Sequence, residues 1–171
     1  MSNLTYIKTG RPEFDELTPR VQAFLEKDTM DMVIDGDAIR GYRSPDTPAV
    51  WIRDHSDIMR GARHFEQDMT SAVTHFADTQ ARNGRVFDYF TVQPEKIPCE
   101  RENWSKYVRV PVEADVEYRF VNGAFIAWQA TGDDAWIRSL IPNLEHALQY
   151  VFSHPWRWDP DTELVKRAYT I

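Results

Sequence analysis

Apolar residues recur at helical spacing near the start of this chain. Between residues 12 and 28 they lie three or four positions apart, at Phe14, Leu17, Val21, Phe24 and Leu25. Steps of this length place side chains on one face of an α-helix. The pattern therefore predicts a first helix over residues 12–28, and Pro19 inside it either splits this helix or marks the start of its second half.

The same periodicity returns in two pairs of helical stretches further along the chain. The members of these pairs are residues 58–65 with 69–77, and residues 116–128 with 137–151. Gly132 provides a stop within the second pair, and Asp133 is a good N-cap for its second helix. Short turns make consecutive helices antiparallel neighbours. The sequence thus predicts an all-α fold of antiparallel helical hairpins.

Segments without helical periodicity separate these pairs. Residues 30–34 form a short strand-like stretch that ends at the turn signal of residues 35–37. Residues 85–111 and the segment after Ser153 are long connections that contain several aromatic residues. In antiparallel hairpins such connections meet at one end of the assembly, and long loops in compact domains are usually functional. We therefore expect a functional site at that end.

Composition and charge narrow the class of protein. The chain has 171 residues, of which 42% are hydrophobic and 13% aromatic, enough to bury the core of one domain. Its formal charge of −7, without a cluster of Lys or Arg, argues against binding nucleic acid or an anionic membrane. The N-terminus lacks the apolar core of a signal peptide, and no apolar run reaches the ~18 residues that a membrane helix needs. We expect a soluble, cytoplasmic protein.

Most motifs for cofactors and common catalytic centres are missing. Cys99 is the only cysteine, so an internal disulfide is excluded. His55 and His64 lack the spacing of a helical zinc site, and the chain has no glycine-rich phosphate loop and no catalytic-serine elbow. The sequence therefore predicts neither a metal nor another cofactor.

Three groups of charged and aromatic residues fall at the expected end. The first contains Trp51, Arg53 and Asp54, with Asp57. The second runs from Glu113 through Asp115 to Glu117, and the third contains Arg157, Trp158 and Arg167. Cleavage of a glycosidic bond needs a carboxylic acid and a second carboxylate. Sugars also bind flat aromatic surfaces and charged forks, which Trp and Arg supply. These residue types together point to a sugar-binding pocket.

Each group also has a purely structural interpretation. Acidic residues at the start of a helix are favoured by the helix dipole and by capping, which would account for Asp54, Glu113 and Asp115. Arg53 and Asp54 would then form an ordinary surface pair, and Trp51 and Trp158 would lie at the edge of the core.

The segment Trp51-Ile52-Arg53-Asp54 resembles a substrate-contact element of the six-hairpin glycosidases, which include glucoamylase-like and rhamnosidase-like enzymes. Residues 112–115, followed by an aromatic-rich helix, a Thr-Gly-Asp turn and a second helix, are similar to a barrel hairpin of that group. The likeness covers residues 45–171. It implies an α/α barrel and a glycoside hydrolase acting on an oligosaccharide or glycoside.

The resemblance also implies roles for individual residues. Arg53 and Asp54 would contact sugar hydroxyls at the cleavage point, and Glu113 or Asp115 would be a further contact or the catalytic acid. Trp51, Trp158 and Arg167 complete the candidate substrate-binding set.

Such barrels contain twelve helices, whereas this sequence predicts about five. We therefore expect one α-helical domain that is an incomplete α/α barrel, with residues 1–50 as a lead-in and residues 51–171 as hairpins. Either a missing C-terminal half or a homo-oligomer would complete it. The alternatives are a non-catalytic carbohydrate-binding or assembly protein, and a sugar epimerase or polysaccharide lyase with His55 or Tyr169 as its base. Two carboxyl groups roughly 5–10 Å apart across an open pocket would favour hydrolysis.

Overall fold

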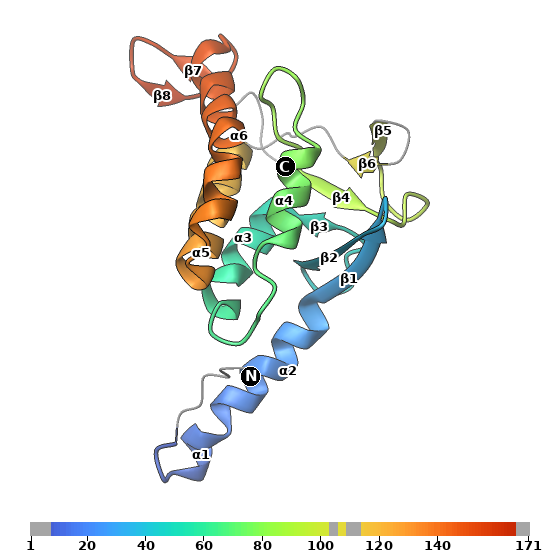
Figure 1. Ribbon diagram of the computed structural model, residues 1–171, viewed down its shortest axis with the longest axis vertical. Helices are drawn as coiled ribbons and strands as arrows, with labels where there is room; N and C mark the ends of the chain where they lie inside the picture. The colour runs from blue at the N-terminus through green and yellow to red at the C-terminus, as the bar shows by residue number, and fades with distance from the viewer. Residues whose placement is uncertain (1–7, 103–105, 109–113, 167–171) are drawn as a thin grey trace.

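The computed structural model describes residues 8–102, 106–108 and 114–166, and its elements are labelled in Figure 1. The helices are α1 (Pro12–Asp15), α2 (Leu17–Asp28), α3 (Ile52–Ala62), α4 (Ser71–Asp78), α5 (Val116–Thr131) and α6 (Asp134–Ser153). The strands are β1 (Thr29–Ile34), β2 (Asp37–Tyr42), β3 (Val50–Trp51), β4 (Tyr89–Thr91), β5 (Glu100–Glu102), β6 (Lys106–Val108), β7 (Trp158–Asp159) and β8 (Leu164–Val165).

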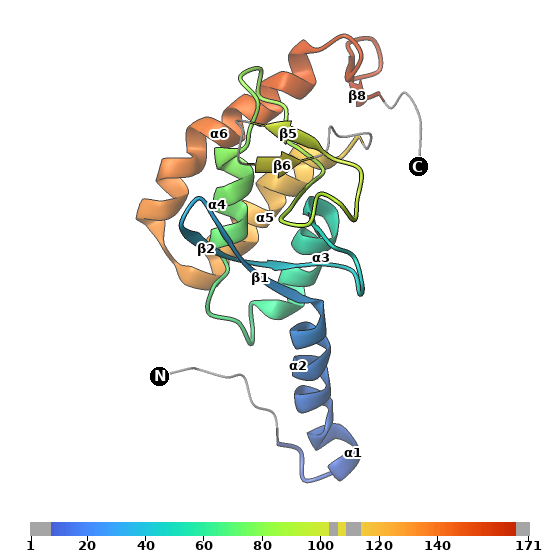
Figure 2. The same ribbon diagram turned by 90° about the vertical axis from the view of Figure 1, so that its right-hand side faces the viewer.

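The main body is layered. Helices α5 and α6 lie side by side on one side, and α3 and α4 form the middle. Strands β1 to β6 lie beyond α4, whereas β7 and β8 lie at the end of α6 (Figures 1 and 2). The described strands form three antiparallel sheets, with orders β1-β2, β3-β4-β6-β5 and β7-β8. A single cluster of buried side chains runs from β1 and β2 through α3 and α4 to α5 and α6. Strands and helices therefore share one hydrophobic core.

The expectation of an all-α fold is wrong, because the described chain is a mixed α/β structure. Most of the strands that were missed have two or three residues, too short to show an alternating pattern. They are stabilised by distant partners, since Val50 pairs with Phe90 and Phe90 pairs with Val108. The expected toroid of helical hairpins is wrong for the same reason, because strands β1 and β2 contribute to the core beside the helices.

The strand-like stretch at residues 30–34 is confirmed as most of β1. Met30, Met32 and Ile34 are buried while the residues between them are exposed, as expected for a strand with one face on the core. Asp35 and Gly36 both have positive φ, at 55° and 96°, which suits the two-residue turn of a hairpin. Local pattern and turn chemistry thus agree in this hairpin.

The pair α5–α6 matches the predicted hairpin. Gly132 adopts the left-handed conformation at the end of α5, with φ of 67°. The side chain of Asp133 accepts a hydrogen bond from the Trp136 N–H at 2.9 Å and so caps α6. In contrast, α3 packs mainly on α5, and α4 packs mainly on β2. The helices of the first predicted pair, α3 and α4, therefore pack on different elements, although they are consecutive in sequence.

Candidate functional site

The segment that begins α3 is anchored to the neighbouring strands β3 and β4. Trp51 is the last residue of β3 and the N-cap of α3, and the Ile52 N–H donates to the Asp88 carbonyl at 2.8 Å. The half-buried Trp51 ring packs on Tyr89 of the neighbouring strand, with ring centres 4.6 Å apart. Trp51 is therefore fixed in place at the point where Arg53 and Asp54 start the helix.

Charged side chains join the start of α3 to the start of α5. The Arg53 guanidinium donates to Asp115 with an N–O distance of 2.6 Å, across 62 positions of sequence. Asp115 also accepts from the Nε of Arg119 at 2.9 Å, and Arg119 binds Asp57 at 2.5 Å. Arginine and aspartate thus alternate along a network that the first and second predicted groups share.

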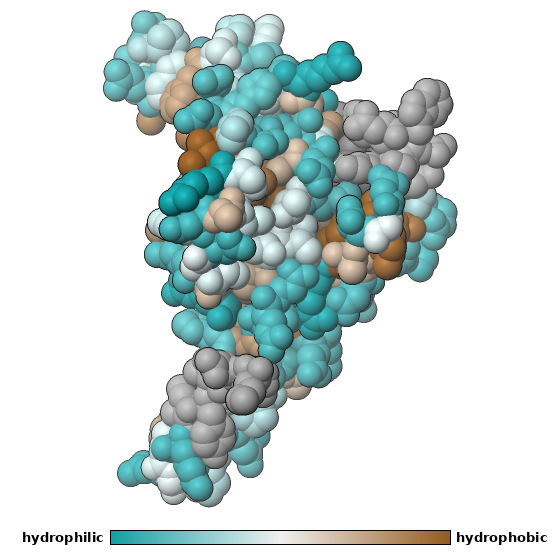
Figure 3. All heavy atoms as spheres, viewed as in Figure 1, coloured by the Kyte–Doolittle hydropathy of each residue, from teal (hydrophilic) through white to brown (hydrophobic). Residues whose placement is uncertain are grey.

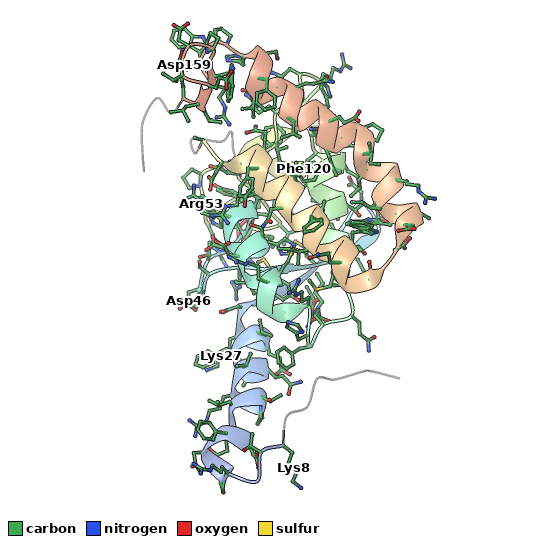
Figure 4. All side chains as sticks on the ribbon, turned by 90° about the vertical axis from the view of Figure 1, so that its left-hand side faces the viewer. Lys8, Lys27, Asp46, Arg53, Phe120 and Asp159 are labelled. Carbon is green, nitrogen blue, oxygen red and sulfur yellow. The ribbon has the colours of Figure 1, made fainter. Side chains whose placement is uncertain are left out.

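Asp54 lies beside this network with a different partner. The Ser44 hydroxyl donates to one of its carboxylate oxygens at 2.6 Å, and the side chain is half-buried. Figure 4 shows Arg53 at the start of α3, on the side of the molecule that also carries Asp159 further along. A tethered carboxylate next to a fixed aromatic ring and a guanidinium is a suitable surface for sugar hydroxyls.

Asp115 is held in its ionised form. Partial burial would raise its pKa, but the hydrogen bonds from Arg53 and Arg119 outweigh it and lower the pKa of this carboxyl. Asp115 is the N-cap residue of α5, yet its side chain makes no capping hydrogen bond. Its carboxylate therefore serves the interaction between helices, and the purely capping interpretation does not apply to it.

The third predicted group reaches the second through a buried ion pair. Arg157 donates to Glu117, whose side chain is 0% exposed, and also to the Ala114 carbonyl at 3.5 Å. Glu117 accepts from the Val86 N–H at 3.3 Å as well, and burial raises the pKa of this carboxyl. Glu117 thus links α5 to the segments that contain Val86 and Arg157. Because its side chain is fully buried, a ligand cannot reach it.

The structure brings together some of the predicted site residues. Trp51, Arg53, Asp54 and Asp115 lie around the joined starts of α3 and α5. Trp158 instead packs edge-on against Phe152, with ring centres 4.9 Å apart, while its neighbour Arg157 binds Glu117 of α5. The other two predicted residues, Glu113 and Arg167, lie outside the described residues.

One member of the network, Arg119, was missed by the sequence analysis. Arg119 follows Asp115 by four positions, whereas Asp57 already belonged to the first predicted group. Side chains at this spacing are neighbours on a helix, so charge pairing was a usable signal. The linking contact between Arg53 and Asp115 joins separate helices, and no local pattern reveals it.

His55, a candidate base of the lyase or epimerase alternative, is a core residue. It is 3% exposed, its Nδ1 accepts from the Tyr42 N–H at 3.1 Å, and its ring stacks on that of Tyr42. Burial lowers the pKa of His55 to about 4, although Asp68 acts in the opposite direction. The imidazole is thus neutral at physiological pH and is packed away from solvent. Tyr169, the other candidate base, lies outside the described residues.

The titration of His55 should make stability depend on pH. The unfolded chain binds a proton at this residue near pH 6.5, whereas the folded chain binds it only near pH 4. Lowering the pH from 6.5 to 5 should therefore reduce the free energy of unfolding by about 2 kcal/mol more in the natural chain than in His55→Gln. Urea denaturation at the two pH values measures this difference. Equal pH dependence in both proteins would contradict the prediction.

Other places in the described structure offer weaker sites. A shallow hollow lies over the hairpin β1–β2, where Figure 3 shows hydrophobic atoms on the surface and Val33 is exposed. Its charged group Arg40 is already bound by Asp31 at 2.8 Å and by Glu66 at 2.7 Å. Among the described residues, no three His, Cys, Asp or Glu side chains are grouped as metal ligands.

The surface at the starts of α3 and α5 is therefore the best candidate site in the described chain.

No described helix is both long enough and apolar enough to cross a membrane. Comparisons with models of protein families, with curated proteins and with solved structures found none that matches this chain.

Proposed function

We propose that this chain binds a carbohydrate on the surface formed by the starts of α3 and α5, as the sugar-binding part of a glycoside hydrolase. The observation that carries the proposal is the Arg53–Asp115 ion pair of 2.6 Å. It brings Asp115 to the start of α3, the segment that contains Trp51 and Asp54, so aromatic, cationic and anionic residues occur at the joined helix starts.

The exposure of these groups supports binding of a polar ligand. The Arg53 and Asp115 side chains are 43% and 35% exposed, so a ligand has access to groups whose positions are already fixed. Preorganised charged groups lose less conformational entropy when they bind sugar hydroxyls. The half-buried ring of Trp51 offers a flat apolar surface for the C–H face of a sugar.

The protonation states give Asp115 a defined role within this proposal. Two arginines keep it ionised, which suits a carboxylate that activates water or stabilises positive charge on the sugar. It does not suit the acid that protonates the leaving oxygen. The pKa of Glu117 is raised, but its buried side chain does not reach a ligand. In this proposal the proton donor is therefore a residue other than Asp115 and Glu117.

A non-catalytic carbohydrate-binding protein is the second candidate. The observation that favours it is the neutralisation of Asp115 by Arg53 and Arg119, because such a carboxylate is already satisfied by its partners. In that case the site would bind an oligosaccharide without cleaving it.

The substitution Asp54→Asn tests the proposed binding site. It should reduce oligosaccharide binding at least about tenfold, because a neutral amide replaces a charged acceptor of hydroxyl hydrogen bonds. The melting temperature should change by less than about 3 °C, since the partner of the Asp54 carboxylate is the hydroxyl of Ser44 and not a buried charge. A glycan array would identify the best ligand, and calorimetric titration would compare the two proteins.

Asp134→Asn is the matched control, because Asp134 lies in the first turn of a helix as Asp54 does, but at the end of α5 opposite to Asp115. It should retain the affinity of the natural chain. If Asp54→Asn lowers stability strongly and leaves binding intact, Asp54 is a structural residue that holds Ser44. If no oligosaccharide binds the natural chain, the proposed function is wrong.

A further inference from the structure

The N-terminal helices α1 and α2 contact the described body only at the end of α2, where Leu25 packs against the core. No residue of either helix is buried, and α2 extends away from the layered body (Figures 1 and 2). Glu16, the residue between the two helices, has helical backbone angles. Isolated helices of about this length are only marginally stable in water, so packing on another surface is expected.

The apolar residues of this segment have the spacing of a coiled-coil seam. Phe14, Leu17, Val21 and Phe24 follow one another at steps of three, four and three, and they are between 41% and 66% exposed. An average step of 3.5 residues keeps a seam facing another helix over successive turns. The exposed stripe therefore fits a second helix of similar length.

The charges beside the seam favour an antiparallel copy of the same helices. When Phe14 is aligned with Phe24 of a second copy, the positions of Glu13 and Lys27 face each other at both ends. In a parallel pair, Glu13 would instead face Thr18. Arg20 lies near the centre of the antiparallel pair, where its own Glu16 neutralises it at 2.6 Å.

The position of α2 on the body favours the same orientation. α2 joins the body at its C-terminal end, through Thr29 of β1. An antiparallel pair places the two bodies at opposite ends, whereas a parallel pair crowds them at one end. Acidic residues outnumber basic ones from residue 12 to residue 28, which disfavours an anionic membrane as the partner.

We infer that α1 and α2 form an antiparallel two-helix interface with the same helices of a second copy of this chain. Phe14, Leu17, Val21 and Phe24 form its apolar seam, and Glu13 pairs with Lys27 of the other copy. The interface is separate from the carbohydrate surface at α3 and α5, so the two proposals are tested independently.

Sedimentation equilibrium of the full chain over a range of concentrations tests this interface. The natural chain should dimerise, and Val21→Glu should weaken the dimer at least about tenfold because it buries a charge in the seam. Ala23→Glu is the matched control, since it adds the same charge to an exposed position outside the seam. At concentrations low enough to dissociate the dimer, the melting temperatures should be similar, because neither position is in the core.

Charge reversal tests the orientation. Glu13→Lys and Lys27→Glu should each weaken self-association about fivefold, because each places like charges together at both ends. An equimolar mixture of the two variants should associate as tightly as the natural chain, since each end of a mixed pair then sets one lysine opposite one glutamate. A monomeric natural chain, a dimer unaffected by Val21→Glu, or a mixture no tighter than the single variants would overturn the proposal. Binding of a monomeric chain to phosphatidylserine vesicles would also overturn it.

Discussion

Arg157→Met is expected to lower the free energy of unfolding by about 3–5 kcal/mol at pH 7. The substitution leaves the Glu117 carboxylate, which is 0% exposed, without its buried cation. The hydrogen bond from the Val86 N–H remains, but a single neutral donor does not replace the lost charge. Urea denaturation of the natural chain and the variant would measure the loss.

The pH dependence of this loss follows from the same burial. Burial raises the pKa of Glu117 in the folded chain, and removing Arg157 raises it further because that cation lowers it. The pKa of this carboxyl in the unfolded chain is near 4.5. As the pH rises above that value, the unfolded chain releases the proton while the folded variant still holds it, which favours unfolding. The loss should therefore be smaller at pH 5 than at pH 7.

A double variant separates the charge effect from a packing effect. Glu117→Gln combined with Arg157→Met removes both charges and should recover much of the stability that Arg157→Met loses. If Arg157→Met costs less than about 1 kcal/mol, the ion pair does not hold the segment after α6 against α5.

Gly84→Ala should destabilise the protein by about 3 kcal/mol or more. Gly84 has φ of 92°, where a Cβ costs about 1–2 kcal/mol. An added Cβ would also lie 2.2 Å from the His146 carbonyl oxygen of α6, which cannot shift without moving the helix. Overpacking of this kind costs about 1–3 kcal/mol further. The shift of the urea midpoint measures the total.

Gly36→Ala is a closely matched control for this substitution. Gly36 has φ of 96°, nearly the same as Gly84, but nothing lies within 4 Å of an added Cβ. It should therefore show the backbone cost alone, about 1–2 kcal/mol. Equal losses in the two variants would show that the turn at Gly84 does not press on α6.

The candidate site was partly accessible to sequence analysis. Long connections and helix starts pointed to Trp51, Arg53, Asp54 and Asp115, and the structure joins the starts of α3 and α5 through Arg53 and Asp115. Trp158 was assigned to the same group because it follows a helix end, but its ring packs on Phe152. Sequence spacing locates a residue on an element, whereas the orientation of its side chain depends on neighbours from other elements.

Local patterns were sufficient for the helices and for one hairpin. The hydrophobic period located α5 and α6, Gly132 and Asp133 marked their junction, and the turn after β1 was identified from residues 35–37. These features depend on side-chain spacing and on backbone preferences of single residues, which act over a few positions.

Tertiary structure alone decided the fold class and the contacts of the site. β3 and β4 are short strands that exist because Val50 and Phe90 meet across 40 positions, and neither strand has a pattern of its own. The Arg53–Asp115 and Arg157–Glu117 pairs likewise join distant segments. Such contacts are stabilised by burial and by charge in the folded chain, so their energy is absent from any local stretch of sequence.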